Sequence, residues 1–424
     1  MKKILVRAGF DPHKTYNPYD YITKGFVGNN SGNLLFAYGV LNVLNTEETI
    51  IEQTYECNWS DKEAEYINDN YSAFILPLAD GFRQNFIPIL NGFTALINRL
   101  KIPVIVIGVG YRTSYEPDFS TNRELDKAVT NFVKAVLNHS TQLGLRGEIT
   151  GKYLKKLGFR PEVDYTPIGC PSLYTYGNTI HTKDLNDIHN LVFNTSIKAQ
   201  KNVDEMTFNT LRRYPNHWMI QQEHTEFLDM FIGQHTKWGK PVVANVFENS
   251  SFKKLNAEDR IRFFFDVPSW VNYMKDFDFF FGTRFHGSVA AILAGLPHVI
   301  IPIDGRMREM SEYHNITRLS PMDINGDSDI DKYLSKLDFK STERKQKENL
   351  EHYIDFLEAN GLDHIFKKKK NYNFRESPME RKMENKIHVI HTIDSLGFLD
   401  KMVRISYINH IFIKRKIYSM MNKL

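Results

Sequence analysis

Short runs of apolar residues recur along the first half of the chain, and each is followed by a turn and then by helical spacing. The strand-like runs are residues 3–8, 73–78, 103–108 and 141–145. The helix-like segments are residues 34–44, 91–100, 122–137 and 148–157. Continuous apolar strands that alternate with helices are typical of a parallel sheet covered on both faces. The first half is therefore predicted to be an α/β domain.

Residues 168–190 interrupt this alternation, because they are rich in glycine, proline, asparagine and threonine. The pattern then starts again, with strand-like runs at residues 191–194, 218–222, 277–281 and 298–302 and a helix at 287–294. We therefore divide the chain into an N-terminal α/β domain (residues 1–180), a C-terminal α/β domain (181–340), a closing helix (341–366) and a tail (367–424). The closing helix either completes the second domain or packs back on the first.

The composition fits a globular protein of more than one domain. The 424 residues exceed one ordinary domain, and 42% hydrophobic and 25% charged residues are typical of a large packed core. Arg7 interrupts the first apolar run, which is too short for a signal peptide, and no segment is long enough to span a membrane. Cys57 and Cys170 fit neither a disulfide framework nor a zinc site, so we expect a reducing, cytoplasmic location.

Charge divides the chain into an acidic body and a basic tail. Residues 367–424 carry 14 lysines and arginines against 5 acidic residues, a net of +9, and the rest of the chain has a net of −5. Apolar runs at 387–393, 396–408 and 411–421 alternate with basic residues, which indicates one or two basic amphipathic helices. These helices either pack on the body or contact an anionic membrane or an assembly partner. The total charge of +4 does not indicate nucleic acid as a partner.

The segment 278–310 carries the strongest signal for a binding site. An apolar strand ends at Gly282, the turn contains Arg284 and His286, and a helix follows at once. In open α/β sheets, ligands bind where strand carboxyl ends meet helix N-termini, and such a terminus favours an anion. Arginine adds a fixed charge with two parallel donors, and histidine titrates near neutral pH. The alternative is structural, with Arg284 in an ion pair between domains and His286 as a helix cap.

This segment resembles the signature of the polysaccharide pyruvyl transferases: Arg-Phe-His-Gly, a helix of small residues, Gly-Leu-Pro, a strand and an Asp-x-Arg turn. Four further motifs resemble that family in the same order over about residues 1–340. They are Gly28–Asn33, the loop Gly108-Val109-Gly110-Tyr111, Leu145–Thr150 with Leu157-Gly158, and Gly169-Cys170-Pro171-Ser172. The sequence departs from the family at Asn33, where Asp is common, and over 147–150, where an Asp and a Ser are common. The tail lies outside the resemblance.

The resemblance implies two Rossmann-like domains that face each other across a cleft, as in GT-B-like glycosyltransferases, here with a basic helical tail. It implies phosphoenolpyruvate as donor, a sugar as acceptor and a pyruvate ketal as product, with no metal or other cofactor. The donor carboxylate and phosphate need cationic partners, for which Arg284 and Arg146 are the candidates, while His286 transfers a proton or contacts the leaving phosphate. The implied substrate-binding residues are Asn30, Asn33, Gly108, Gly110, Arg112, Thr283, Phe285, Gly287, Asp304 and Arg306.

Several positions have a structural interpretation as well. Asp304 and Arg306 either face the cleft or cap the next helix. Residues 221–224 follow a strand and could bind sugar hydroxyls, but a solvated loop is the favoured interpretation. Gly108 and Gly110 lack the third glycine of a dinucleotide site. Cys170 has no evident partner base and is interpreted as a small buried apolar residue.

The favoured function is a cytoplasmic enzyme that pyruvylates a sugar of a cell-surface polysaccharide, or of its lipid-linked precursor at the inner face of the membrane. One alternative is a nucleotide-sugar glycosyltransferase of the same fold, because fold alone does not decide function. A second alternative is a non-catalytic relative, which the presence of Arg284, His286 and Arg146 disfavours.

Overall fold

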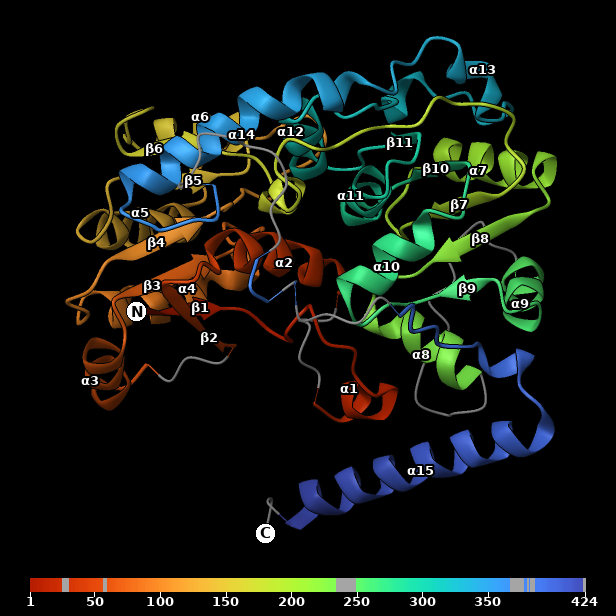
Figure 1. Cartoon of the computed structure of the whole chain (residues 1–424), viewed down its shortest axis with the longest axis horizontal. Helices are drawn as coiled ribbons and strands as arrows, with labels where there is room; N and C mark the ends of the chain where they lie inside the picture. Colours follow the sequence, from red (N-terminus) through yellow and green to blue (C-terminus); the bar gives the residue numbers. More distant parts are fainter. Residues whose placement is uncertain are drawn as a thin grey trace.

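The structure is a computed structural model, and it describes residues 1–24, 30–55, 59–233, 249–366, 377–379, 381 and 386–421. Its core is two parallel β-sheets, one in each half of the chain (Figure 1). The first sheet contains β1 (Lys2–Arg7), β2 (Thr49–Thr54), β3 (Ala73–Pro77) and β4 (Val104–Ile107) in the order β2-β1-β3-β4. A parallel bridge between Val109 and Leu145 extends it to β5 (Leu143–Leu145), which pairs with β6 (Tyr165–Pro167).

The second sheet repeats this design after residue 190. Its strands are β7 (Leu191–Asn194), β8 (His217–Ile220), β9 (Ile261–Arg262), β10 (Phe279–Gly282) and β11 (His298–Ile300), in the order β11-β10-β7-β8-β9. In each sheet the strand order changes direction once, between β1 and β3 and between β7 and β10. These are the switch points of Rossmann-like folds, next to which ligands bind. The predicted pair of Rossmann-like domains is confirmed.

Helices flank both sheets. In the first half they are α1 (Pro18–Lys24), α2 (Gly32–Leu44), α3 (Asp61–Asn70), α4 (Ile87–Ile97), α5 (Arg123–Leu137) and α6 (Glu148–Lys156). In the second half they are α7 (Lys201–Arg213), α8 (His224–Ile232), α9 (Asn249–Ala257), α10 (Val267–Met274), α11 (Phe285–Leu293), α12 (Gly305–Tyr313) and α13 (Asp331–Leu334). The last two helices are α14 (Ser341–Ala359) and α15 (Phe398–Met421).

α2 lies between the two domains. Its sequence is apolar all round, which is typical of a helix that is buried on every side. Every residue of α2 except Asn33 is buried, and the helix packs against α10 and α11 of the second domain. Asn33 is therefore the position at which this helix meets the space between the domains.

α14 packs back on the first domain. Leu350, Tyr353 and Leu357 share a hydrophobic core with Ile4 of β1 and Ile105 of β4. The helix crosses the top of the molecule in Figure 1 from the second domain to the first. Of the two positions that the sequence left open, the structure therefore shows packing on the first domain.

The segment before α15 is part of the body. Ser377 donates a hydrogen bond to Asn42 of α2 over 3.1 Å, and the buried Thr392 donates its backbone N–H to Asp259 over 2.9 Å. The predicted helical tail is confirmed by α15 (Phe398–Met421), whereas the apolar residues 387–393 before it form no α-helix. The predicted run of lysines at 367–370 and Lys423 lie outside the described residues.

α15 runs along one side of the molecule (Figure 1). Its inner face packs against α8 through the buried Ile408 and Ile411. Lys401 pairs with Asp394 over 2.6 Å, and Arg404 stacks on Phe231 at 4.1 Å. These two basic side chains thus hold the helix to the body. Within the described part of the chain, no helix combines the length and apolar character needed to cross a bilayer.

Candidate active site

A cleft of about 760 Å³ lies between the two domains. Its walls come from segments that follow strand carboxyl ends in both sheets, namely those after β3, β4 and β5 on one side and after β7, β8, β10 and β11 on the other. This is the position at which parallel α/β sheets bind ligands.

Arg146 follows β5 and is almost completely buried, at 1% exposed. Its Nε donates a hydrogen bond to the backbone oxygen of Gly108 over 3.0 Å, and its guanidinium lies 5.0 Å from the centre of the Phe36 ring. Its Nη2 is buried and has no hydrogen-bond partner. Burial penalises the cationic form of Arg146 and so lowers its pKa, although the nearby Asp80 and Glu309 oppose the shift. An anion in the cleft would remove this penalty.

His286 lies in the first turn of α11 and lines the same cleft. Burial, with Arg146 and Arg306 nearby, holds the pKa of its imidazole well below the usual value, so the ring is neutral at pH 7. Its Nε2 is buried and has no hydrogen-bond partner. Its Nδ1 lies so close to Gly32, the first residue of α2, that a side chain at Gly32 would overlap it. The two domains therefore meet tightly at His286.

Arg284 is engaged by carboxylates of its own domain. Its Nη1 donates to Glu223 Oε1 over 2.7 Å, its Nη2 pairs with Glu226, and its Nε donates to the backbone oxygen of Thr195 over 2.7 Å. Glu226 also accepts two backbone N–H groups, from Gln222 and Glu223. Burial raises the pKa of Glu226 even though Arg284 and these N–H groups oppose the shift. Arg284 is therefore an ion-pair residue, but its partners belong to its own domain and not, as the structural interpretation expected, to the other domain.

Glu223 also connects the first domain to the second. Asn30 Nδ2 donates to Glu223 Oε1 over 2.9 Å, and the N–H of Ser31 donates to the backbone oxygen of Gln222 over 2.8 Å. The polar start of α2 is thus anchored on the segment that follows β8. Of the N-terminal loop motif, Gly28 and Asn29 lie outside the described residues.

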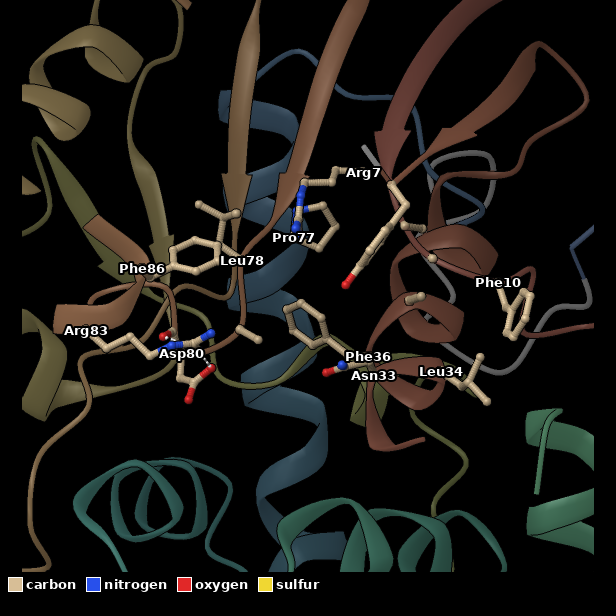
Figure 2. Close-up of a pocket in the computed structure, with 15 residues that line it drawn as sticks. Arg7, Phe10, Asn33, Leu34, Phe36, Pro77, Leu78, Asp80, Arg83 and Phe86 are labelled. Atoms are coloured by element: carbon tan, nitrogen blue, oxygen red, sulfur yellow. Dashed lines mark hydrogen bonds and ion pairs between the residues drawn. The ribbon is translucent and has the colours of Figure 1, made fainter. Parts of the chain in front are cut away.

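Asp80, directly after β3, is surrounded by arginines. Arg83 and Arg112 both pair with it, and Arg306 Nη1 lies 3.6 Å from its Oδ2 (Figure 2 shows the pair with Arg83). Burial raises the pKa of Asp80, but Arg306, Arg83 and Arg112 outweigh burial and hold the pKa below its usual value. Arg306 also pairs with Asp304 over 3.3 Å, so three arginines with two carboxylates leave this wall of the cleft with one positive charge in excess. Such a wall favours an anionic ligand.

Asp304 caps α12, and both Asp304 and Arg306 face the cleft. Asp304 accepts the N–H of Met307 over 2.9 Å as the N-cap of α12, and both residues line the cavity. Behind them, the buried Glu309 of α12 accepts the N–H of Thr150 in α6 over 2.9 Å, so it joins the two domains. Burial raises the pKa of Glu309 to about 7, although hydrogen bonds from Thr150 oppose the shift.

Ten of the thirteen predicted site residues line the cleft, and Gly108, Gly110 and Gly287 do not. Gly108 has a positive φ of 65° and packs against Phe36, and its carbonyl orients Arg146. A Cβ at Gly110 would lie 3.0 Å from Arg146 Cδ. Gly287 allows Asn194 to approach α11 so closely that a side chain would overlap it. The three glycines lie behind the wall and make room for the residues that form it.

Sequence reasoning missed several lining residues, namely Asp80, Arg83, Ser196, Lys198 and Glu226, whereas Gln222 and Glu223 belong to the segment that it considered as a possible sugar contact. The expectation that residues 221–224 form a solvated loop is wrong, because Gln221 and Gln222 are buried at 3% and 1% exposed. The available signal was position, since Asp80 and Lys198 also follow strands of a parallel sheet. Cys170 is buried, and burial raises the pKa of its thiol, which fits the interpretation as an apolar residue. Cys57 lies outside the described residues.

Residues 30–305 match the family model for polysaccharide pyruvyl transferases, and this match covers more than half of the chain. The chain belongs to the polysaccharide pyruvyl transferase family. The match contains Arg146, Arg284 and His286 and ends within the Asp-x-Arg turn. It supports a transferase rather than a protein of another class. No protein of curated function matches the chain.

Solved structures show distant similarity. A UDP-N-acetylglucosamine 2-epimerase is 12% identical, with 88% of this chain and 99% of that one covered, at a TM-score of 0.46. An Anabaena protein, HepE, solved with UDP and glucose, is 12% identical over 85% and 98% of the two chains, at a TM-score of 0.44. The Neisseria meningitidis UDP-GlcNAc 2-epimerase bound to UDP-GlcNAc is 11% identical over 84% and 100%, at a TM-score of 0.44. No residue of the site is assigned from these similarities. In the described residues, no cluster of His, Cys, Asp or Glu could hold a metal ion.

Proposed function

We propose that this member of the family transfers the pyruvyl group of phosphoenolpyruvate to two hydroxyls of a sugar in a cell-surface polysaccharide or its lipid-linked precursor. Both hydroxyl oxygens bond to C2 of the donor, and the C2–O–phosphate bond breaks. One hydroxyl proton ends on the methylene carbon, which becomes the methyl group of the ketal, and the other leaves with phosphate. The reaction needs no oxidant and no external reductant.

The buried, unsatisfied guanidinium of Arg146 is the observation that carries this proposal. Its Nη2 has no partner, and Arg306 and Arg112 share one carboxylate beside it. The donor presents a carboxylate and a phosphate, which are ligands that guanidinium groups bind with two parallel hydrogen bonds. The cationic wall at Asp80 and the orphaned nitrogen of Arg146 together form a complement to a small molecule with two anionic groups.

We propose that His286 transfers a proton from a sugar hydroxyl to the departing phosphate. A neutral imidazole next to bound phosphate can accept the proton of a sugar hydroxyl and then donate it to the departing phosphate. The low pKa of the His286 imidazole supports the first step, because the ring enters the reaction unprotonated. A bound phosphate dianion would raise that pKa and so support the second step.

Calorimetric titration with phosphoenolpyruvate, followed by measurement of phosphate release with a panel of nitrophenyl and lipid-linked sugars, tests the proposal. We expect saturable binding of phosphoenolpyruvate and phosphate release only when an acceptor is present. UDP and UDP-glucose form the second arm, because a nucleotide-sugar glycosyltransferase would bind them and leave phosphoenolpyruvate unbound. Absence of binding by phosphoenolpyruvate would contradict the proposed donor.

A lipid-linked acceptor requires the enzyme to work beside a membrane, and α15 offers a surface for this contact. Phe398, Leu399 and Val403 are 77%, 76% and 67% exposed, and Met402 and Ile413 are exposed on the same helix. Ile408 and Ile411 face inward, so α15 has apolar residues on both its inner and its outer side. We propose that the outer side inserts into the interface of an anionic inner membrane, with the basic tail nearby.

The double variant Leu399→Asp, Val403→Asp tests this contact without removing the packed segment before α15. Vesicles of phosphatidylglycerol and phosphatidylethanolamine should carry the wild-type protein to the pellet at low salt and leave the variant in solution. Met322→Asp is the matched control, because Met322 is 63% exposed but lies away from α15. Equal sedimentation of all three proteins would show that the outer side of α15 does not bind membranes.

A further inference from the structure

A second hollow lies at the switch point of the first sheet. It encloses about 150 Å³ between the carboxyl ends of β1 and β3 and the first turns of α2. In Figure 2, Arg7 points into it from the end of β1, Pro77 and Leu78 close it from β3, and Asn33 and Phe36 approach from α2. We call this hollow the β1–β3 pocket. It is separate from the cleft but shares Asn33, Asp80 and Arg83 with it.

The position of the β1–β3 pocket indicates a ligand site. In an open parallel sheet, the strands diverge at the switch point and leave a crevice outside their carboxyl ends. The cleft occupies the switch point of the second sheet, where β7 is followed by Ser196 and β10 by Arg284. The β1–β3 pocket is its counterpart in the first domain. A donor in the cleft and a second substrate in this pocket would therefore face each other across their shared residues.

The lining of the β1–β3 pocket combines aromatic rings with planar polar groups. Phe36, Tyr55 and Phe86 supply rings, and Arg7, Asn33 and Arg83 supply hydrogen-bonding groups. A pyranose has one apolar C–H face and a rim of hydroxyls, so it packs on a ring and bonds to planar side chains at its edge. Because the side chains of Ala8 and Ala37 are small, the pocket has room for a single sugar ring. An extended nucleotide would not fit this volume.

Phe36 connects the β1–β3 pocket to the proposed donor site. Its ring lines the pocket, and the Arg146 guanidinium lies 5.0 Å from the centre of that ring. Asp80 and Arg83 lie where the two cavities meet. A sugar ring held here would present its edge to the cleft at a short distance from Arg146.

We propose that the β1–β3 pocket binds one monosaccharide ring of the acceptor and directs its reacting hydroxyls past Asn33 and Asp80 into the cleft. This inference rests on the proposed function, because the substrate in question is the acceptor of the same reaction. Nothing in the pocket's position or size requires the acceptor to be lipid-linked, so free glycosides are suitable probes.

The test measures sugar binding and donor binding separately on the full chain. Tyr55→Ala removes a ring that is 37% exposed, and Ala37→Leu fills the pocket from α2. Tyr66→Ala is the matched control, because Tyr66 is 53% exposed on α3 of the same domain and lines neither cavity. Ligand-observed NMR with methyl glycosides of glucose, galactose, mannose and N-acetylglucosamine reports sugar binding. Calorimetry with phosphoenolpyruvate reports donor binding.

We expect at least one methyl glycoside to bind the wild-type protein and the Tyr66→Ala variant. Tyr55→Ala and Ala37→Leu should weaken that binding by about tenfold or more, since each removes the stacking surface or the space. Donor affinity should stay within about twofold in all variants. Sugar binding that is unchanged in both pocket variants, or absent from the wild-type protein, would overturn the inference. Failure of the wild-type protein to bind phosphoenolpyruvate would instead count against the proposed function, whatever the glycosides do.

Discussion

Arg146 and Arg284 line the same cleft from opposite domains, and their surroundings differ in kind. Arg284 has its three donor groups on Thr195, Glu223 and Glu226, and only 10% of its side chain is exposed. Arg146 is more deeply buried and has one hydrogen bond to a backbone oxygen, with Nη2 left without a partner. A buried ion pair is already satisfied, whereas a buried cation without an acceptor is costly unless a ligand completes it.

We propose that this difference separates a binding side of the cleft from a supporting side. The binding side contains Arg146, His286 and the arginines on Asp80. The supporting side contains Arg284, Glu223 and Glu226 and, through Asn30, holds the start of α2 against the second domain. Two arginines that look equivalent in a motif thus have different expected roles. The following variants test this division, in order of their expected effect on turnover.

Arg146→Met should have the largest effect. Methionine keeps the length and apolar stem but removes the charge and donors, so phosphoenolpyruvate should bind about tenfold to a hundredfold more weakly. The melting temperature should change little, because the variant also removes an uncompensated buried charge. Calorimetry and thermal unfolding measure the two quantities. Arg160→Met, on an exposed arginine paired with Asp164, is the control and should leave donor affinity unchanged. Full donor affinity in Arg146→Met would place the anion site elsewhere.

Gly32→Ala should reduce turnover and should also cost about 1–3 kcal/mol of stability, because the domain contact at Gly32 becomes overpacked. The added methyl group would overlap His286 Nδ1, so the imidazole must move, and a misplaced proton-transfer group lowers the rate by about tenfold or more. Alanine is a better helix former than glycine at this first residue of α2, which offsets only part of that cost. Phosphate release with saturating donor measures the effect. Gly397→Ala serves as control, because the nearest atom to its Cβ would be 4.0 Å away. Wild-type turnover in Gly32→Ala would mean that the position of His286 is not critical.

Arg284→Lys should lower the stability of the fold more than it lowers the affinity for the donor. Lysine keeps the charge but cannot donate to Thr195, Glu223 and Glu226 in the same planar arrangement, so unfolding should become easier by about 2 kcal/mol. Donor affinity should fall by no more than about threefold. Chemical denaturation measures the change in stability, and calorimetry measures the change in donor affinity. A collapse in affinity at unchanged stability would move Arg284 to the binding side.

Glu309→Gln should leave donor binding near the wild-type value and change how stability depends on pH. Because burial raises the pKa of Glu309 from 4.5 to about 7, the folded state holds a proton that the unfolded state releases between these values. Glu309 therefore makes the wild-type protein less stable as the pH rises from 4.5 to 7, and above pH 7 that loss is complete. The variant should lack this decline, so its advantage in melting temperature should grow toward pH 7. If the melting temperatures of both proteins changed with pH in the same way, Glu309 would not have the raised pKa.

The alternation of strands and helices was predictable because it depends on local patterns. Residues 73–78 and 103–108 are apolar without interruption, and both become buried strands, β3 and β4. The strands β2, β6 and β9 escaped notice, because β2 is only half-buried and the other two have three and two residues. The turn at Arg284 and His286 was predictable too, since a strand end followed by a helix brings both side chains to the carboxyl edge of a sheet.

The ion pairs could not be predicted from the sequence, because they join residues that are distant along the chain. Glu226 lies 58 positions before Arg284, and Arg306 reaches Asp80 from the other domain. The charge of an arginine is set by its residue type, but whether a carboxylate neutralises it depends on which strand ends the two sheets bring together. The placement of α14 on the first domain depends in the same way on which apolar surface is left uncovered.

The sequence by itself therefore determined the two parallel sheets, the edge at which ligands bind and the family to which the chain belongs. Hydrophobic periodicity and strand–turn–helix motifs act over a few residues, so these features can be read along the chain. The tertiary structure alone decided that Arg284 is paired while Arg146 is not, and that a second pocket opens between β1 and β3. Charge compensation and empty space arise only when segments far apart in sequence are packed against each other.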